Sequence, residues 1–314
     1  MKISEPRALC TLQRSSEGRK CKRLAPTACG KSAGACKTPH MHPNPHPNLP
    51  QPWGRIPITQ ARAVRGVLTD IDDTLTTAGA ITADALQALA DLRAAGLPVI
   101  AITGRPMGWS TGFAMDWPID AIVAENGAVA LFRDGNALRV EYDQPHDVRA
   151  ANTLRLQDVA AQVLSEVPGA VMAQDSAGRV TDIAVDHGEF AHLDADQIAR
   201  VLSVMRCAGM TATVSSIHIN AWFGEHHKLS GARWITKRLH RVDIDEEAGR
   251  WVYVGDSTND QLMFGHFPLS VGVANLMHFK DELTVWPKFI TQGARGAGFA
   301  EVARTLLSAR AARG

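Results

Sequence analysis

Short apolar runs alternate with helical patterns over most of this chain, and this alternation constrains the fold more than any other feature. The runs at residues 64–69, 99–102 and 119–124 have the length of strands and are mostly apolar, which is typical of strands buried on both faces of a sheet. Residues 82–95 show one apolar helical face and are followed by Gly96, a common helix terminator. Strands joined through a helix run parallel. The sequence therefore predicts an α/β fold with a doubly wound parallel sheet.

The pattern changes between Asn126 and Trp222 and then returns. In the changed stretch we expect a hairpin over 128–132 and 138–142, helices near 147–166 and 193–208, and strands at 179–185 and 211–218. After it we expect a helix near 229–240, strands at 251–254, 269–273 and 288–291, a short helix after Asn259 and a closing helix at 298–312. The prediction is a Rossmann-like core of residues 61–142 and 221–314, interrupted by an inserted α+β cap at residues 143–220.

The first 60 residues differ from the rest in charge and composition. They hold ten Lys and Arg against two Asp and Glu, whereas the whole chain has 33 against 32. A run of Pro, His and Asn at 40–50 has almost nothing to bury, so we expect residues 1–60 to be a disordered tail and a chain beginning near Arg62 to fold and stay active. A translation start at Met41 is an open alternative. No apolar segment of a signal peptide follows the early basic residues.

Cysteine and charge distribution narrow the class of protein further. Four of the five cysteines lie in the tail, at positions 10, 21, 29 and 36, and their spacing favours incidental residues over a zinc site, as does the spacing of the tail histidines at 40, 42 and 46. The body of the chain has only Cys207, so we expect a cytoplasmic protein. No run approaches the roughly 20 apolar residues of a membrane span. The scattered basic residues of the tail do not indicate a nucleic-acid partner, and no oligomeric state follows from the sequence.

Polar segments follow the predicted parallel strands, at the sheet edge where open α/β folds bind ligands. They are Asp70-Ile71-Asp72-Asp73-Thr74, Thr103-Gly104-Arg105, Lys228 before a helix, and the run 255–260 with Asp256, Asn259 and Asp260. Taken singly, an Asp pair at a strand end is more often a turn, Thr-Gly a helix cap and a lysine a solvated charge. Together, Asp70, Asp72 and Asp256 would repel one another unless a cation joined them, and oxygen ligands favour Mg²⁺.

This ordered set of motifs, D-x-D-x-T, T-G-R, Lys and G-D-x-x-N-D, resembles the haloacid dehalogenase-like superfamily of phosphohydrolases over about residues 62–312. The matching residues are Asp70, Asp72, Thr74, Thr103, Lys228, Gly255, Asp256, Asn259 and Asp260. The place of the insert, after Glu125-Asn126-Gly127-Ala128 and before the lysine, resembles the C2 cap of the Cof-type or IIB branch, which includes sucrose-phosphate and mannosyl-phosphoglycerate phosphatases. One departure is that Lys228 is followed by Leu229 where those relatives commonly have Gly.

The resemblance implies a Mg²⁺-dependent phosphatase acting on a small phosphorylated metabolite, such as a sugar or polyol phosphate. Asp70 would form an aspartyl-phosphate, and Asp72 would act as general acid and base. The implied phosphate ligands are Thr103, Gly104, Lys228 and Asn259, and the implied metal ligands are Asp70, the main-chain carbonyl of Asp72, Asp256 and Asp260. A phosphomutase of the phosphomannomutase type and a ligand-binding module without activity are the alternatives.

Substrate selection is expected from polar residues of the cap and of the core beneath it. The candidates are Arg105, Asn126, Asp186, His187, Glu189, His218, Asn220 and Trp222. Each alone has a commoner structural explanation, but as a group they suit a hydroxylated substrate. Chemistry in the core and selection in the cap should then be separable, so that His187→Ala or Trp222→Ala alters the choice of substrate and spares a minimal phosphate ester.

Overall fold

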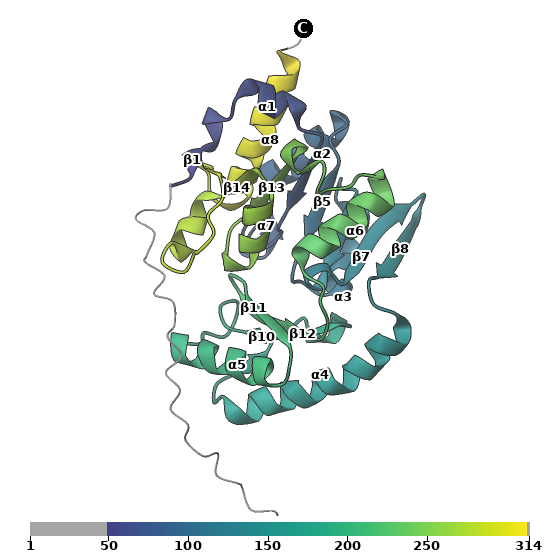
Figure 1. Ribbon diagram of the computed structural model, residues 1–314, viewed down its shortest axis with the longest axis vertical. Coiled ribbons are helices and arrows are strands. Elements are labelled where there is room, and N and C mark those ends of the chain that lie inside the picture. The colour runs from purple at the N-terminus through teal and green to yellow at the C-terminus, as the bar shows by residue number, and fades with distance from the viewer. Residues whose placement is uncertain (1–48, 313–314) are drawn as a thin grey trace, which may run out of the picture. The chain divides into compact units, whose positions relative to one another are not determined.

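The computed structural model describes residues 49–312, which contain a nine-stranded sheet in the order β1-β15-β14-β13-β2-β5-β6-β7-β8 (Figure 1). The strands are β1 (Gln51–Pro52), β2 (Gly66–Thr69), β5 (Val99–Ile102), β6 (Ala121–Ala124), β7 (Val129–Asp134), β8 (Ala137–Tyr142), β13 (Trp251–Gly255), β14 (Leu269–Gly272) and β15 (Phe289–Ile290). Pairing is parallel from β1 to β6, and only β7 and β8 are added antiparallel. The predicted doubly wound α/β fold is confirmed.

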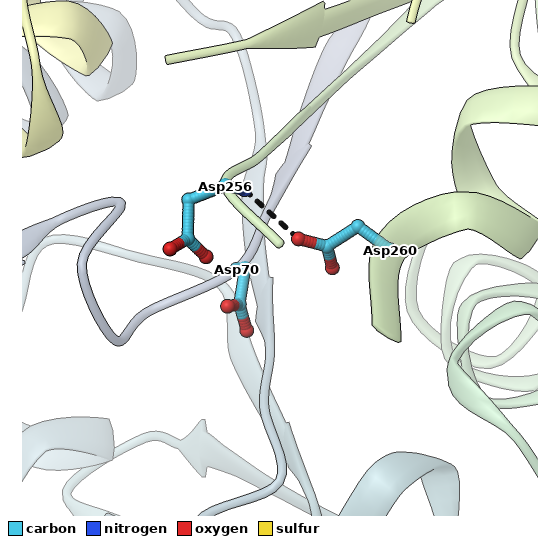
Figure 2. Close-up of side chains that lie close together, drawn as sticks. All are labelled: Asp70, Asp256 and Asp260. Atoms are coloured by element: carbon cyan, nitrogen blue, oxygen red, sulfur yellow. Dashed lines mark hydrogen bonds between the residues drawn. The ribbon is translucent and has the colours of Figure 1, made fainter. Parts of the chain in front are cut away.

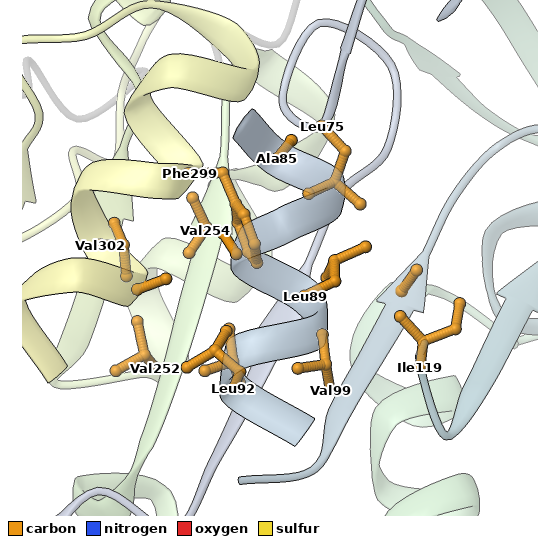
Figure 3. Packing of buried hydrophobic residues seen from close by; sticks show 14 of the residues in the cluster. Leu75, Ala85, Leu89, Leu92, Val99, Ile119, Val252, Val254, Phe299 and Val302 are labelled. Atoms are coloured by element: carbon orange, nitrogen blue, oxygen red, sulfur yellow. The ribbon is translucent and has the colours of Figure 1, made fainter. Parts of the chain in front are cut away.

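Helices cover both faces of this sheet. On one face lie α1 (Ile58–Ala63), α2 (Ala83–Ala94), α3 (Met107–Asp116) and α8 (Arg295–Ala311), and on the other lie α6 (Lys228–His240) and α7 (Gln261–His266). Figure 3 shows Phe299 of α8 beside Val254 of β13, and Leu89 of α2 belongs to the same cluster; all three are fully buried. Their burial fixes the central strands, and with them the polar residues that follow each strand.

The inserted cap has a sheet of its own, in the order β11-β12-β10-β9 with antiparallel pairing. Its elements are α4 (His146–Glu166), β9 (Val171–Met172), β10 (Asp182–Asp186), α5 (Ala195–Cys207), β11 (Thr211–Val214) and β12 (His218–Trp222). Figure 1 shows β10, β11 and β12 between the two cap helices and the core. Apolar side chains such as Val163, Val201 and Ile219 fill the space between the sheet and its helices.

The expected single strand over 211–218 is wrong. The chain turns after β11, where the Ser215 hydroxyl accepts the amide of His218 at 3.0 Å, and returns as β12. Two adjacent serines favour this turn over a continuous strand. Because β12 continues to Trp222, the cap sheet also extends past the boundary expected at residue 220.

The expected tail boundary at residue 60 is also wrong for the residues from Gln51 onward. Strand β1 pairs with β15, and Trp53 is fully buried with its ring edge-on to Phe289 at 5.4 Å. Helix α1 follows and packs on α8. These residues lack a sequence period because contacts with distant elements, rather than an amphipathic pattern of their own, hold them in place. The tail cysteines and histidines lie outside the described residues.

The remaining elements are short. A hairpin of β3 (Thr76–Thr77) and β4 (Ala80–Ile81) follows the first Asp motif. Short 3-10 helices occur at η1 (Trp53–Arg55), η2 (Glu125–Gly127), η3 (Ser176–Gly178), η4 (Ala248–Arg250), η5 (Thr258–Asp260) and η6 (Ala274–Phe279). Among residues 49–312, no helix combines the length and the apolar content needed to cross a membrane.

Candidate active site

Three buried carboxylates meet at the carboxyl edge of the parallel sheet. Asp70 follows β2, Asp256 follows the adjacent strand β13, and Asp260 ends the turn η5 (Figure 2). One oxygen from each lies within 4.8 Å of the others. Neighbouring parallel strands end side by side, so the two strands bring Asp70 and Asp256 together as the motif positions predicted.

The acid cluster carries more negative charge than its surroundings balance. Burial raises the pKa of Asp70 to about 7, although the charge of Lys228 opposes this shift. Burial, together with the charges of Asp70 and Asp260, also raises the pKa of Asp256 well above its ordinary value. A bound cation would remove this conflict by favouring the ionised carboxylates.

Lys228 is the one cation in contact with this cluster among the described residues. It begins α6, and its Nζ lies 2.9 Å from Asp70 Oδ1, 2.7 Å from Asp260 Oδ1 and 3.3 Å from Asn259 Oδ1. Burial alone would lower the pKa of Lys228, but the charges of Asp260 and Asp70 outweigh burial and raise it. The lysine is therefore held charged beside Asp70.

Asp260 uses both of its carboxylate oxygens to support neighbouring groups. Oδ2 accepts the backbone amides of Asp256 at 2.9 Å and Ser257 at 3.2 Å, while Oδ1 accepts Lys228 Nζ and the hydroxyl of Tyr253. These four hydrogen bonds use two lone pairs on each oxygen. The arrangement favours a supporting role for Asp260, which fixes the lysine and the 256–257 backbone, over direct ligation of a metal.

The Thr103-Gly104-Arg105 loop follows β5 beside this cluster. Thr103 is fully buried, and its hydroxyl oxygen accepts the amide of Arg105 at 3.0 Å. A Cβ added to Gly104 would lie 3.1 Å from Asn220 Oδ1 and 3.3 Å from Asn126 Nδ2, so only glycine fits without displacing these amides. The loop is thus closely packed against one residue of the core and one of the cap.

Arg105 connects the second motif aspartate to the cap. Its Nε lies 3.0 and 3.1 Å from the two carboxylate oxygens of Asp72, and its Nη2 lies 2.8 Å from Glu189 Oε1 of the cap. Burial would raise the pKa of Glu189, but hydrogen bonds from His218 and Arg105 hold it at about 2. Asp72 therefore faces the core–cap junction, while Asp70 faces the acid cluster.

A pocket of about 340 Å³ lies at this junction. Its wall combines the first motif loop, the cap loop that contains Glu189 and Phe190, and the start of α8. The lining residues are Asp72, Asp73, Thr76, Ala78, Gly79, Arg105, Gly188, Glu189, Phe190, Ile217 and Arg295. Of the predicted selection residues, Arg105 and Glu189 line this pocket.

Other predicted selection residues have different partners. The prediction that Trp222 contacts substrate is wrong, because its ring is buried and its Nε1 donates to the carbonyl of His226. Asp186 accepts four backbone amides of the following loop, from residues 188–191. His187 lies 3.0 Å from the carbonyl of Ser215 and lines a separate groove. The remaining three are His218, which is buried behind Glu189, and Asn126 and Asn220, which lie against Gly104.

Several residues near the site were not predicted as functional residues from the sequence. Asn275 donates to Asp256 Oδ2 at 3.3 Å and to the carbonyl of Asp73. The others are Tyr253 below Asp260 and a buried set at the core–cap contact, Glu125, Arg179 and Asp182. A partial signal existed for Glu125, because the run Glu-Asn-Gly is a turn sequence, and residues 125 and 126 do adopt positive φ angles of 49° and 56°.

Clustered strand-end carboxylates, a buried lysine and an α+β cap inserted into a doubly wound core are the features that the resemblance to haloacid dehalogenase-like hydrolases implied. A family model described as haloacid dehalogenase-like hydrolase matches residues 67–182, which include Asp70 and Thr103 and extend into the cap. The resemblance to haloacid dehalogenase-like hydrolases and the enzyme class, both predicted from the motifs, are confirmed.

This chain aligns with nearly the whole length of several known relatives. A phosphoglycolate phosphatase from Methanothrix thermoacetophila is 27% identical over 246 residues, which are 76% of this chain and 95% of the relative. The solved structure of Thermoplasma acidophilum 0175 has a TM-score of 0.60 at 15% identity and covers 77% of this chain and 98% of its own. The sucrose-phosphatase of Synechocystis, solved with sucrose and phosphate, has a TM-score of 0.55 at 14% identity with the same coverage. At these identities the two structures show a shared fold.

Proposed function

We propose that this enzyme is a Mg²⁺-dependent phosphatase that hydrolyses a small phosphorylated metabolite through an aspartyl-phosphate on Asp70. The observation that carries the proposal is the position of Asp70, buried between Lys228 and Asp256 at the carboxyl edge of the sheet. A nucleophilic carboxylate beside a fixed cation suits attack on an anionic phosphate. The phosphatase relative supports the same reaction class.

The donor set fits a magnesium ion. Asp70 and Asp256 supply buried carboxylate oxygens, and the main-chain carbonyl of Asp72 is two residues from Asp70. Burial, with the neighbouring carboxylates, raises the pKa of both acids, and a bound cation would oppose this shift. Hard oxygen donors of this kind are what Mg²⁺ prefers. When bound, the ion would offset the charge of Asp70 and of the incoming phosphoryl group.

The residues around Asp70 can divide the reaction between them. A carboxylate oxygen of Asp70 would form a bond to phosphorus as the ester P–O bond breaks, and Asp72 would give its proton to the leaving oxygen. Asp72 would then take a proton from the water that attacks phosphorus, which releases phosphate and restores Asp70. Lys228 and the Thr103 hydroxyl would hold nonbridging oxygens, with the Gly104 amide and Asn259 as further ligands.

The junction pocket suggests the kind of leaving group. Its volume of about 340 Å³ suits a small molecule, and its charged lining of Arg105, Glu189 and Arg295 suits a polar one. We propose a sugar or polyol phosphate. Phosphoglycolate, which the curated relative's name indicates for that protein, is a second candidate because two arginines line the pocket. A cytoplasmic location belongs to the same proposal, since the described residues hold one cysteine, Cys207, which is unpaired.

The test is phosphate release from a panel of sugar, polyol and carboxylic phosphates and from para-nitrophenyl phosphate, with Mg²⁺ and with EDTA. Turnover that requires Mg²⁺ and is abolished in Asp70→Asn, but not in the exposed control Asp147→Asn, is the expected result. Absence of release from every ester would overturn the proposal. Isomerised sugar phosphate without free phosphate would overturn it in favour of a mutase.

A further inference from the structure

Besides the ion pairs of the Arg105 side chain, the cap holds the backbone of the Thr103-Gly104-Arg105 loop at the carbonyl of Gly104. The oxygen of Gly104 accepts Arg179 Nη1 at 2.9 Å and Asn220 Nδ2 at 3.2 Å. Both donors belong to the cap, Arg179 just before β10 and Asn220 within β12. Gly104 directly follows Thr103, so two side chains of the inserted cap hydrogen-bond to the backbone of the loop that carries Thr103.

The same peptide unit controls the Thr103 hydroxyl. The Gly104 carbonyl and the Arg105 amide belong to one planar group, and the amide donates to Thr103 Oγ1 at 3.0 Å. Because this oxygen accepts the amide, its own proton is free to point to another acceptor. Rotation of the peptide would break this arrangement, and the two cap donors oppose such rotation by holding the carbonyl.

The donors themselves are fixed in a buried network. The Arg179 side chain is 2% exposed, and its Nη1 lies 2.9 Å from each carboxylate oxygen of Asp182, which also accepts Asn220 Nδ2 at 3.1 Å. Burial raises the pKa of Asp182 to about 7 in spite of the adjacent arginine. Buried ion pairs are often replaceable by apolar residues without loss of stability, so stability alone is a weak reason for this network.

The cap segment that carries Arg179 is held against the core by hydrogen bonds and by a close approach of the two backbones. Glu125 of the core is fully buried and accepts the backbone amides of Val180 and Thr181. Nearby, a Cβ added to Gly108 of α3 would lie 2.8 Å from the Cα of Gly178, so the two backbones touch. The distance from Arg179 to the loop is therefore set by backbone contacts.

We propose that Arg179 and Asn220 are positioning residues for phosphoryl transfer, which act through the Gly104–Arg105 peptide to aim the Thr103 hydroxyl at the phosphate. Neither residue lines the junction pocket, so neither is placed to read the organic part of the substrate. The role rests on the proposed function. It differs from a role in selection because every substrate, including a minimal ester, depends on the same hydroxyl.

The test is a double-mutant cycle with Asn220→Ala and Thr103→Val, measured with para-nitrophenyl phosphate and with the best substrate of the panel. We expect Asn220→Ala to lower kcat/KM about tenfold for both substrates, as loss of one directed hydrogen bond predicts. In the Thr103→Val background the same change should alter kcat/KM less than twofold. Asn152→Ala removes a buried asparagine elsewhere in the cap and serves as the matched control, with less than a twofold effect.

Effects that multiply in the cycle would overturn the proposal, because Asn220 would then act independently of Thr103. A loss confined to the larger substrate would also overturn it, in favour of substrate contact. If thermal unfolding shows that Asn220→Ala does not fold, Arg179→Lys replaces it in the same cycle, since one ammonium cannot reproduce the planar fork between Gly104 and Asp182. Inactivity of the wild-type enzyme would instead overturn the proposed function.

Discussion

Replacement of Trp53 by alanine tests whether residues 51–63 are part of the folded domain. The Trp53 side chain is 0% exposed and packs edge-on against Phe289, and Ile56 and Ala61 of the same segment are also buried. Trp→Ala at such a site costs about 3–5 kcal/mol of unfolding free energy. The Trp53 Nε1 has no hydrogen-bond partner among the described residues, so its removal recovers part of this loss and the lower half of the range is expected.

In a chain of this size, each kcal/mol shifts Tm by roughly 2–4 °C, so Trp53→Ala should unfold about 6–16 °C below the wild type. Thermal unfolding followed by circular dichroism measures this. Ile58→Ala, in the same segment but at a side chain 51% exposed, should shift Tm by no more than about 2 °C. A chain beginning at Leu49 should have the same Tm as the full chain. A chain beginning at Val64 should have a lower Tm than Trp53→Ala. Equal Tm values for the two shortened chains would refute the reasoning.

Three further predictions concern Phe190 of the cap, the buried His226 before α6, and Lys228. Phe190 is 63% exposed at the junction pocket. Phe190→Ala should therefore change kcat/KM by up to about tenfold for some substrates of the panel and little for others. An equal loss of kcat/KM for every substrate would contradict this prediction. Burial lowers the pKa of His226 from 6.5 to about 4. The contribution of this group to the unfolding free energy should therefore be fully retained above pH 6.5 and fall by up to about 3 kcal/mol as the pH drops toward 4. Between pH 7.5 and pH 4.5, the urea midpoint should fall less in His226→Phe than in the wild type. Lys228→Met leaves buried carboxylates unpaired. It should therefore lower the unfolding free energy by about 3 kcal/mol in the absence of metal and reduce turnover at least a hundredfold. The control Lys237→Met, on the exposed face of the same helix, should change neither quantity.

The parallel strands were predictable because each is buried on both faces and must be apolar over its whole length. Helix α3 was not predicted, because Gly108 and Gly112 weaken its helical pattern. Close contact with Gly178 of the cap explains one of these glycines. Strand β1 was missed because two residues carry no periodic signal and their partner, β15, is distant in the sequence. In each case a tertiary contact outweighed the local preference of the sequence.

The core motifs of the site were predictable for a geometric reason. Residues that end adjacent parallel strands must lie at one edge, so Asp70 and Asp256 could be placed together without knowing any side-chain conformation. The cap residues lacked such a constraint. Arg179 and Asn220 meet the Gly104 carbonyl from 75 and 116 residues away, and no spacing rule relates positions in two separately folded sheets. The pairing could be found only from the structure.

One strand of the cap shows why the division between chemistry and selection does not follow the domain boundary. Residues 218, 220 and 222 alternate along β12 and share the face opposite to Ile219 and Ala221, which pack against the cap helices. His218 supports Glu189 at the pocket, Asn220 holds the carbonyl of Gly104, and Trp222 donates to the carbonyl of His226 before α6. Alternation in the sequence identifies the shared face, but the partner of each position depends on what part of the core lies opposite it. Support of a pocket residue, contact with the Thr103-Gly104-Arg105 loop and attachment of the cap therefore lie two residues apart on the same strand, so under the proposed roles Asn220 would serve the chemistry although it belongs to the cap.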